Sequence, residues 1–271
     1  MSKRYDVLVI DDEPVVLDAV SRVCGAHGIT VDVVLDSQTG LHRLQTHTYR
    51  LILCDLMMPE LDGFRFLERV FEQNHNTPVV MITGYCTIEN AVKSLGSGAV
   101  GYLPKPFTEE ELVSAIHRGL NFSALLRSGN IQASRNQSLD DGTCPDRYYR
   151  LGWISWMTLG EAGAALMGVT DVFLKTIRPI KEIQLFSPRD EIVQGTTCAH
   201  IASTSGLLHD VLAPVSGKIV EINTALHSDL NLLDRDPYGQ GWIYQILPSD
   251  VVYETRHLTV SRSGKKKPNE H

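Results

Sequence analysis

Short apolar runs alternate with amphipathic stretches over the first 121 residues of the chain. The apolar runs lie at residues 7–10, 29–35, 51–54, 79–82 and 100–103. This alternation is typical of parallel strands that are covered by helices. After the first run, Val16, Val20 and Val23 keep a helical spacing behind Pro14, a residue suited to a first helical turn. The pattern predicts an α/β doubly wound fold with a five-stranded parallel sheet.

The hydrophobic pattern changes in the second half of the chain. Residues 127–146 are polar and show no apolar period, which is typical of a linker. Beyond them come short β-prone runs at residues 152–156, 180–186, 191–193, 217–222 and 241–247. We therefore predict a second, mostly β domain. The predicted division is a first domain over 1–122, a linker over 123–146, a second domain over 147–253 and a polar tail over 254–271.

Charge argues against a nucleic-acid-binding role. The formal net charge is −7, and the acidic excess lies almost wholly in the first 125 residues. A domain that binds duplex DNA usually carries a basic face, and the second half has none. Lys265, Lys266 and Lys267 form the only basic run, which reads as a solvated tail. No helix-turn-helix pattern follows residue 122, so a transcription factor is disfavoured and no nucleic-acid partner is expected.

The cysteines and the N-terminus predict a cytoplasmic protein without a membrane partner. The five cysteines are odd in number and show no C-x-x-C spacing, so neither a disulfide framework nor a zinc site is indicated. No N-terminal segment resembles a signal peptide, and no apolar run approaches the roughly 18 residues of a membrane span.

Reactive side chains follow four of the five predicted strands. Asp11 and Asp12 come after the first strand, Asp55 after the third, Thr83 after the fourth and Lys105 after the fifth. In a parallel doubly wound sheet these positions share the carboxyl edge, where binding sites form. Taken singly, Asp11 and Asp12 suit a helix cap and turn, and Asp55 suits an ordinary loop. All five together favour a common site.

The chemistry of these side chains points to phosphoryl transfer. Three carboxylates held together repel one another, and a hard divalent cation such as Mg²⁺ relieves this repulsion. Lys105 supplies a positive charge for phosphoryl oxygens, and the Thr83 hydroxyl can donate a hydrogen bond to them. Asp55 suits the role of nucleophile, which would form an aspartyl-phosphate.

Four segments of residues 4–122 closely resemble the receiver domain of bacterial response regulators. They read VLVIDDEP, LILCDLMMPELDGF, VVMITGY and GYLPKPF. The resemblance implies a flavodoxin-like fold in which Asp55 is the phosphoacceptor and Thr83 and Tyr102 are switch residues. It implies catalytic roles for Asp55, Thr83 and Lys105. It also implies a Mg²⁺ site made by Asp11, Asp12, Asp55 and the backbone carbonyl of Met57.

The same resemblance implies partners and limits on activity. A sensor histidine kinase or a phosphotransfer protein would supply the phosphoryl group, and the receiver would form a homodimer. The protein would not be an enzyme beyond slow self-dephosphorylation, which the bulk of Met57 and Tyr85 beside the pocket would retard. For Tyr102, simple core packing is an alternative to a switch role.

Residues 148–252 resemble the lipoyl-carrying H protein of the glycine cleavage system. The matching segments are MGVTDVFLKTI, APVSGKIVEIN and DPYGQGWIYQILPSD. The resemblance implies a flattened β-barrel of the lipoyl type with a hairpin that presents a lysine. Counting back from Pro214 places Gly206 at that lysine position, and no lysine lies between Lys181 and Lys218. We therefore expect no lipoate and no lipoyl attachment residue.

Other chemistry in the second half is weakly signalled. Ser203, Thr204 and Ser205 suit a polar turn better than a nucleophile. The spacing of Cys198, His200 and His209 is a weak metal pattern. The leading hypothesis is a response regulator that controls a non-lipoylated H-like binding domain with an unknown protein partner. The alternatives are a carrier or adaptor in glycine cleavage or lipoate metabolism, and a ligand-binding sensor role for the β domain.

Overall fold

A five-stranded parallel sheet forms the first domain of the computed structural model, which describes residues 3–59, 61–73, 76–85, 87–131, 144–145, 147–160 and 163–261. The strand order is β2-β1-β3-β4-β5, and every neighbouring pair is parallel. The predicted doubly wound fold is therefore confirmed. The strands are β1 (Arg4–Ile10), β2 (Val31–Val34), β3 (Thr48–Asp55), β4 (Val79–Thr83) and β5 (Gly101–Pro104).

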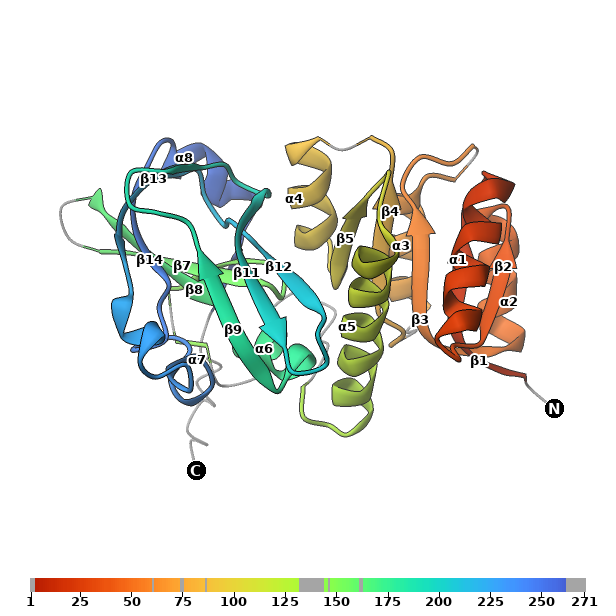
Figure 1. Cartoon of the computed structure of the whole chain (residues 1–271). Coiled ribbons are helices and arrows are strands. Elements are labelled where there is room, and N and C mark those ends of the chain that lie inside the picture. The colour runs from red at the N-terminus through yellow and green to blue at the C-terminus, as the bar shows by residue number, and fades with distance from the viewer. Residues whose placement is uncertain are drawn as a thin grey trace, which may run out of the picture.

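Helices cover both faces of this sheet (Figure 1). They are α1 (Pro14–Ala26), α2 (Ser37–Thr46), α3 (Gly63–Glu72), α4 (Ile88–Gly96) and α5 (Glu109–Arg127). One buried cluster joins α1 and α5 to the sheet, and a second joins α2 and α3 to its other face. Helix α5 begins with the predicted capping box, in which Thr108 and Glu111 each accept a backbone hydrogen bond of the other. It ends at Arg127, within the span that we predicted as linker.

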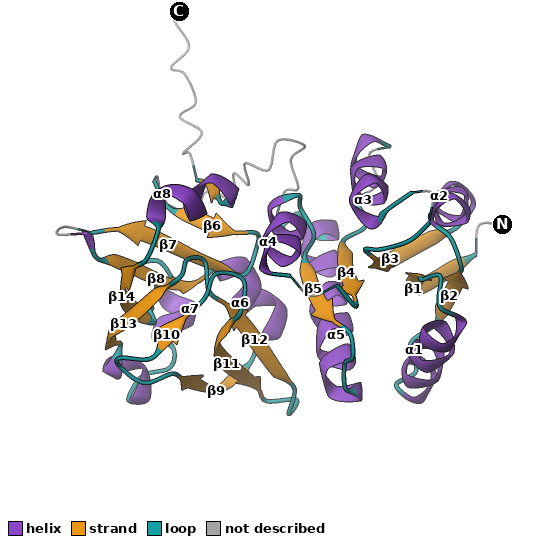
Figure 2. Cartoon of the chain, turned by 90° about the horizontal axis from the view of Figure 1, so that it is seen from above, coloured by secondary structure: helices purple, strands orange, loops and turns teal. Residues whose placement is uncertain are grey.

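The second domain is built from antiparallel strands, as predicted. One sheet has the order β10-β13-β14-β8-β7-β6-β15, and a smaller one has the order β12-β11-β9 (Figures 1 and 2). The strands are β6 (Tyr149–Leu151), β7 (Ser155–Leu159), β8 (Ala165–Val169), β9 (Ile180–Leu185), β10 (Glu191–Ile192), β11 (Thr197–Ser203), β12 (Leu208–Leu212), β13 (Gly217–Ile222), β14 (Tyr244–Pro248) and β15 (Thr259–Val260). Short helices are α6 (Asp171–Ile177), α7 (Leu232–Arg235), α8 (Val251–Glu254), η2 (Thr224–His227) and η3 (Thr255–His257).

Two boundaries in the second domain differ from the sequence prediction. The expected strand over 152–156 is interrupted, because Gly152 has a φ of 53° and forms a turn between β6 and β7. Strand β15 lies in the span assigned to the polar tail, where it pairs with β6. Buried Leu258 and Ser261 flank β15, which explains why this stretch belongs to the fold. Residues 132–143, 146 and 262–271 lie outside the described residues, so most of the predicted linker and tail is not covered.

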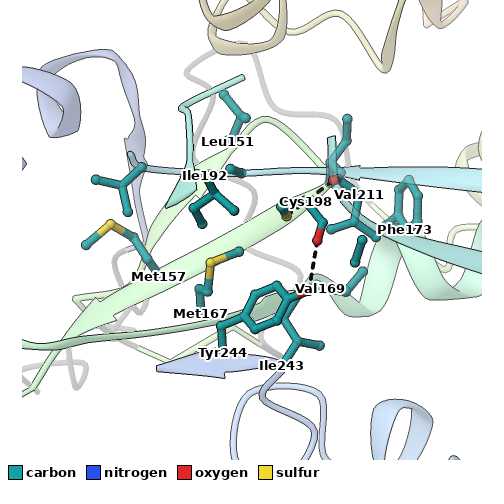
Figure 3. Close-up of a cluster of buried hydrophobic side chains, with 14 of the residues drawn as sticks. Leu151, Met157, Met167, Val169, Phe173, Ile192, Cys198, Val211, Ile243 and Tyr244 are labelled. Carbon is teal, nitrogen blue, oxygen red and sulfur yellow. Dashed lines mark hydrogen bonds between the residues drawn. The ribbon is translucent and has the colours of Figure 1, made fainter. Parts of the chain in front are cut away.

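The core of the second domain is a cluster of aliphatic, sulfur-containing and aromatic side chains (Figure 3). Tyr244 is fully buried, and its hydroxyl donates to the carbonyl of Cys198 at 2.8 Å while accepting from the backbone N–H of Phe186 at 2.7 Å. A buried tyrosine hydroxyl needs such partners. These bonds tie β14 of the large sheet to β11 of the small one. In the described part of the chain, no helix is long and apolar enough to span a membrane.

The two domains pack directly against each other through α4 and α5, which both figures place between the two sets of strands. Trp153 joins the buried cluster of the first domain, with its ring 4.9 Å from that of Phe122 in an edge-on arrangement. Val92 and Leu95 of α4 join the core of the second domain. Asn121 donates from its side chain to the carbonyl of Thr176 at 2.7 Å. We call this contact region the seam.

Candidate functional site

The predicted reactive residues meet at the carboxyl edge of the parallel sheet. Asp11 directly follows β1, Asp55 ends β3, Thr83 ends β4 and Lys105 directly follows β5. Asp11, Asp55 and Thr83 are each at most 3% exposed. The alternation of strands and helices returns the chain to the same edge after every crossover, which is why distant residues converge there.

Lys105 is the centre of this pocket. Its Nζ lies 2.8 Å from Asp11 Oδ2, 3.0 Å from Glu13 Oε1 and 3.1 Å from Asp55 Oδ1. The other oxygen of Asp55 accepts a hydrogen bond from the backbone N–H of Met57 at 2.7 Å. Each Asp55 oxygen therefore has one positively polarised neighbour.

The pKa shifts reflect the conflict between burial and charge pairing. Burial raises the pKa of the Asp11 carboxyl, although Lys105 and the backbone N–H of Glu13 oppose that rise. Burial alone would lower the pKa of Lys105, but its interactions with Asp11 and Glu13 dominate and raise this pKa above its ordinary value. Lys105 therefore stays protonated, and the pocket holds a permanent positive charge between two buried carboxylates.

The pocket has an oxygen atom that suits a cation. Asp11 Oδ2 is buried and accepts no hydrogen bond of good geometry, although the Lys105 ammonium lies near it. An oxygen of this kind is a fitting ligand for a hard divalent cation. Asp12 is exposed, as is Met57. Among the described residues, no three His, Cys, Asp or Glu side chains converge as a metal site, so the four-residue Mg²⁺ ligand set stays a prediction.

Thr83 and Tyr102 connect the pocket to the edge of the sheet. The Thr83 hydroxyl accepts from the backbone N–H of Tyr85 at 3.0 Å. The Tyr102 hydroxyl lies 3.5 Å from the carbonyl of Tyr85, and its ring is partly buried on the edge strand β5. Tyr85 therefore contacts both the Thr83 hydroxyl and the Tyr102 hydroxyl.

Sequence reasoning missed the part that Glu13 plays in the pocket. Its carboxylate accepts a hydrogen bond from Lys105 at 3.0 Å while remaining exposed. The signal was available, because Glu13 directly follows the paired acidic residues after the first strand. Glu13 gives Lys105 a second anchor on the solvent side.

The second domain has no comparable cluster at its β11–β12 hairpin. Ser203 ends β11, its hydroxyl lies 2.7 Å from that of Ser205, and its backbone N–H donates to the carbonyl of Leu207. Gly206 sits at the tip with a φ of 88°, a conformation that favours glycine. The turn is closed by its own polar groups, as the sequence suggested for the three hydroxyl residues.

Cys198, His200 and His209 do not form a metal site. The buried Cys198 thiol donates to the carbonyl of Val211, and His200 Nδ1 pairs with Asp210 at 2.7 Å. His209 is buried at the seam, where its Nδ1 lies 2.8 Å from the Ser114 hydroxyl of α5. His209 is thus a docking residue, which local sequence could not show because its partner comes from the other domain.

Two family models match the chain. Residues 7–117 match the model of the response regulator receiver domain, and residues 147–270 match that of the glycine cleavage H-protein. The transcriptional regulatory protein DltR of Streptococcus agalactiae serotype III is 32% identical over 126 residues, which are 46% of this chain and 56% of that protein. The chain spans about half the length of the curated relatives it matches.

Solved structures resemble each half separately. The receiver domain of the Francisella response regulator 1452 is 34% identical and covers 43% of this chain and 96% of its own, with a TM-score of 0.41. A glycine cleavage system H protein from Mycobacterium marinum is 29% identical and covers 39% of this chain and 86% of its own, with a TM-score of 0.36.

Proposed function

Because the chain joins a response regulator receiver domain to a glycine cleavage H-protein-like domain, we propose that it is a two-component response regulator in which phosphorylation of Asp55 controls the second domain. One observation supports the proposed control of the second domain by phosphorylation. The second domain packs on α4 and α5, the helices that flank the edge strand of Tyr102. The phosphorylation pocket and the seam therefore share one structural element.

The proposed reaction is transfer from a phosphohistidine of a kinase or phosphotransfer protein. An Asp55 oxygen forms a bond to phosphorus while the phosphorus–nitrogen bond to the histidine breaks, and the imidazole leaves with the electron pair. Lys105, now 3.1 Å from Asp55 Oδ1, is placed to follow the charge onto the phosphoryl oxygens. Thr83 at the end of β4 would donate a hydrogen bond from its hydroxyl to the same oxygens.

Receiver domains use Mg²⁺ for phosphorylation, and we propose that Asp11, Asp12, Asp55 and the carbonyl of Met57 hold it here. The cation would neutralise charge between the carboxylates and the incoming phosphoryl group. Asp11 contributes the buried oxygen that now lacks a hydrogen bond. Lys105 would give up part of its contact with that oxygen when the cation binds.

The proposed signal passes from Thr83 to the seam. When the Thr83 hydroxyl turns toward the phosphoryl group, the backbone N–H of Tyr85 loses its acceptor. Tyr102 contacts the carbonyl of Tyr85, so a shift of Tyr85 would alter that contact, and we propose that the Tyr102 ring then moves inward from the edge strand. Helices α4 and α5 lie on either side, and their repacking would weaken the seam and release the second domain.

We propose that the released domain binds a protein partner and carries no lipoate. A lipoyl amide needs an amine on the hairpin, and the residue at its tip is Gly206. Strand β12, which leaves this hairpin, also contacts α5 through the hydrogen bond from Ser114 to the carbonyl of Leu208 at 2.7 Å. DltR is named as a transcriptional regulator, but the sequence of the second half of this chain has no excess of basic over acidic residues, so we propose no nucleic-acid partner.

Phosphate uptake and domain release are measured together. The full chain is incubated with acetyl phosphate and Mg²⁺, with intact mass reporting uptake and small-angle scattering reporting size. We expect one phosphoryl group and expansion of the particle, with neither in Asp55→Asn and both in the exposed control Asp18→Asn. Uptake by Asp55→Asn equal to that of the unaltered chain would refute the phosphoacceptor. If the chain took up phosphate and neither its size nor its dimerisation changed, the proposed control of the second domain would be refuted.

A lipoylation assay separates this function from that of a carrier. The chain is incubated with a lipoyl ligase, ATP and lipoate beside an H protein that carries its lysine. We expect a lipoyl adduct on the H protein alone. An adduct on this chain, mapped to Lys218 or elsewhere, would revive the carrier reading.

A further inference from the structure

A cavity of about 670 Å³ lies between the two domains at the seam. The first domain lines it with residues of α4, β5 and α5, and the second with residues of β11 and β12. Both figures place these elements next to each other. The volume falls within the range of about 300 to 1,000 Å³ that is usual for small-molecule sites. Neither domain encloses this space alone.

Arg118 is the one cavity-lining arginine or lysine among the described residues, and its charge is not neutralised by an ion pair. Its guanidinium lies 5.4 Å from the ring of Phe173, and no hydrogen bond or ion pair involves it in the described part of the chain. Burial lowers the pKa of Arg118 to about 10, although the charge of Asp210 opposes this shift. Arg118 is only partly buried, so its guanidinium is accessible, and an anion beside this partly desolvated cation would offset the cost of its burial.

The acidic side chains around the cavity have other partners. Asp210 pairs with His200 at 2.7 Å, and Glu111 accepts from the backbone N–H of Thr108 at 2.7 Å. Glu110 is exposed. Arg118 is therefore the charged side chain of the cavity with which an anionic ligand would pair.

The remaining lining is largely apolar. Ile154, Leu208 and Leu212 come from the second domain, and Ala115 and the ring of Tyr102 come from the first. A hydrocarbon or aromatic body would bury apolar surface against these side chains, while a single acidic group reached the guanidinium. Both parts of such a ligand have a counterpart in the cavity.

We infer that the interdomain cavity binds a small organic monoanion with an apolar body, whose carboxylate or similar acid group pairs with Arg118. The ligand bridges the two domains, because the guanidinium comes from α5 and the H-like domain adds Ile154, Leu208 and Leu212 to the apolar lining. The test uses the unphosphorylated chain, in which the seam is closed, so failure of binding would leave the proposed function untouched.

Titration calorimetry on the unphosphorylated full chain tests this inference with two probes, octanoate and 2-naphthoate, and with 1-octanol as an uncharged match. We expect at least one probe to bind saturably at a single site. Arg118→Met keeps the apolar stem and should weaken that binding ten- to a hundredfold, on the order expected for a lost charge-assisted hydrogen bond. The exposed control Arg127→Met, on the same helix, should bind normally, and 1-octanol should not distinguish Arg118→Met from the unaltered chain.

A second variant approaches the cavity from the other domain. Leu208→Trp fills the space without touching Arg118 and should abolish binding of the same probe, with circular dichroism confirming the fold of each variant. Absence of saturable binding by both probes overturns the inference. So does a probe whose affinity is unchanged in folded Arg118→Met or, if that variant does not fold, in Leu208→Trp.

Discussion

The pocket around Lys105 lies at the end of β5, and the seam around Trp153 lies on α4 and α5, which contact β5. The two regions are held together by different forces. In the pocket, one ammonium balances two buried carboxylates, so its stability depends on charge. In the seam, aromatic and aliphatic side chains pack together, and polar pairs such as Ser114 with His209 and Asn121 with Thr176 are few. A pocket built from charge responds strongly to a phosphoryl group, whereas a seam built from packing responds to shape. We propose that strand β5 links the two responses, because it carries Tyr102 between the pocket and the seam.

The largest expected effect comes from removing the charge balance of the pocket. Lys105→Met leaves Asp11 and Asp55 buried without their cation, which we expect to lower the free energy of unfolding by about 3 to 5 kcal/mol. Mg²⁺ should restore much of this loss, because it supplies positive charge to the same oxygens. Urea unfolding with chelator and with Mg²⁺ measures both effects.

Lys218→Met, at an exposed strand position, is the matched control for this charge change. It should leave stability and the response to Mg²⁺ near those of the unaltered chain. If Lys105→Met gained no more from Mg²⁺ than this control does, the carboxylates would not need a cation, and the contrast between pocket and seam would fail.

The next effect concerns packing at the seam. Trp153→Ala removes a ring that is 9% exposed and packs edge-on against Phe122, at an expected cost of about 3 kcal/mol. The loss should appear as faster hydrogen exchange in α5, with phosphate uptake at Asp55 retained. Trp153→Phe keeps an aromatic ring and should lose less. If phosphate uptake at Asp55 were lost to the same extent as the protection of α5 from exchange, the pocket and the seam would not be separable.

A third effect depends on pH. Burial, together with the charges of Arg118 and His117, lowers the pKa of His209 from 6.5 to about 3. At and above pH 7 this imidazole is neutral whether the seam is closed or open, so its contribution to the stability of the closed seam is fully present. As the pH falls from 6.5 toward 3, the open state binds a proton that the closed state does not, and the seam loses at most about 1.4 kcal/mol per pH unit.

Small-angle scattering of the full chain between pH 7 and pH 5 measures this opening. We expect the unaltered chain to expand at pH 5 more than His209→Gln does, since glutamine takes up no proton. Identical expansion of both proteins would assign the acid response to the carboxylates of the pocket instead.

The sequence predicted the pocket well and the seam not at all, for a physical reason. Asp11 and Lys105 directly follow a strand and Asp55 and Thr83 end one, so the topology of a parallel sheet alone brings the four together. Glu13 was missed although it stands beside them. Trp153, Ser114 and His209 meet through docking of two domains, which depends on surface shape and leaves no periodic signal in either domain. The turn at Gly152 was missed because a positive φ at glycine is not visible as a pattern.

The smallest effect tests whether polar pairing adds to the seam beyond apolar packing. The Ser114 hydroxyl donates to the carbonyl of Leu208 at 2.7 Å and lies 2.8 Å from His209 Nδ1. Ser114→Ala leaves the part-buried Leu208 carbonyl and the buried His209 imidazole with one partner fewer, so we expect a loss of about 1 kcal/mol in seam stability, read as hydrogen exchange of β12. The same variant should shift the pH response of the seam, because the hydroxyl contacts the imidazole directly. A variant with unchanged exchange and an unchanged pH response would show that packing alone closes the seam, and phosphorylation would then have to act entirely through the shape of β5 and α5.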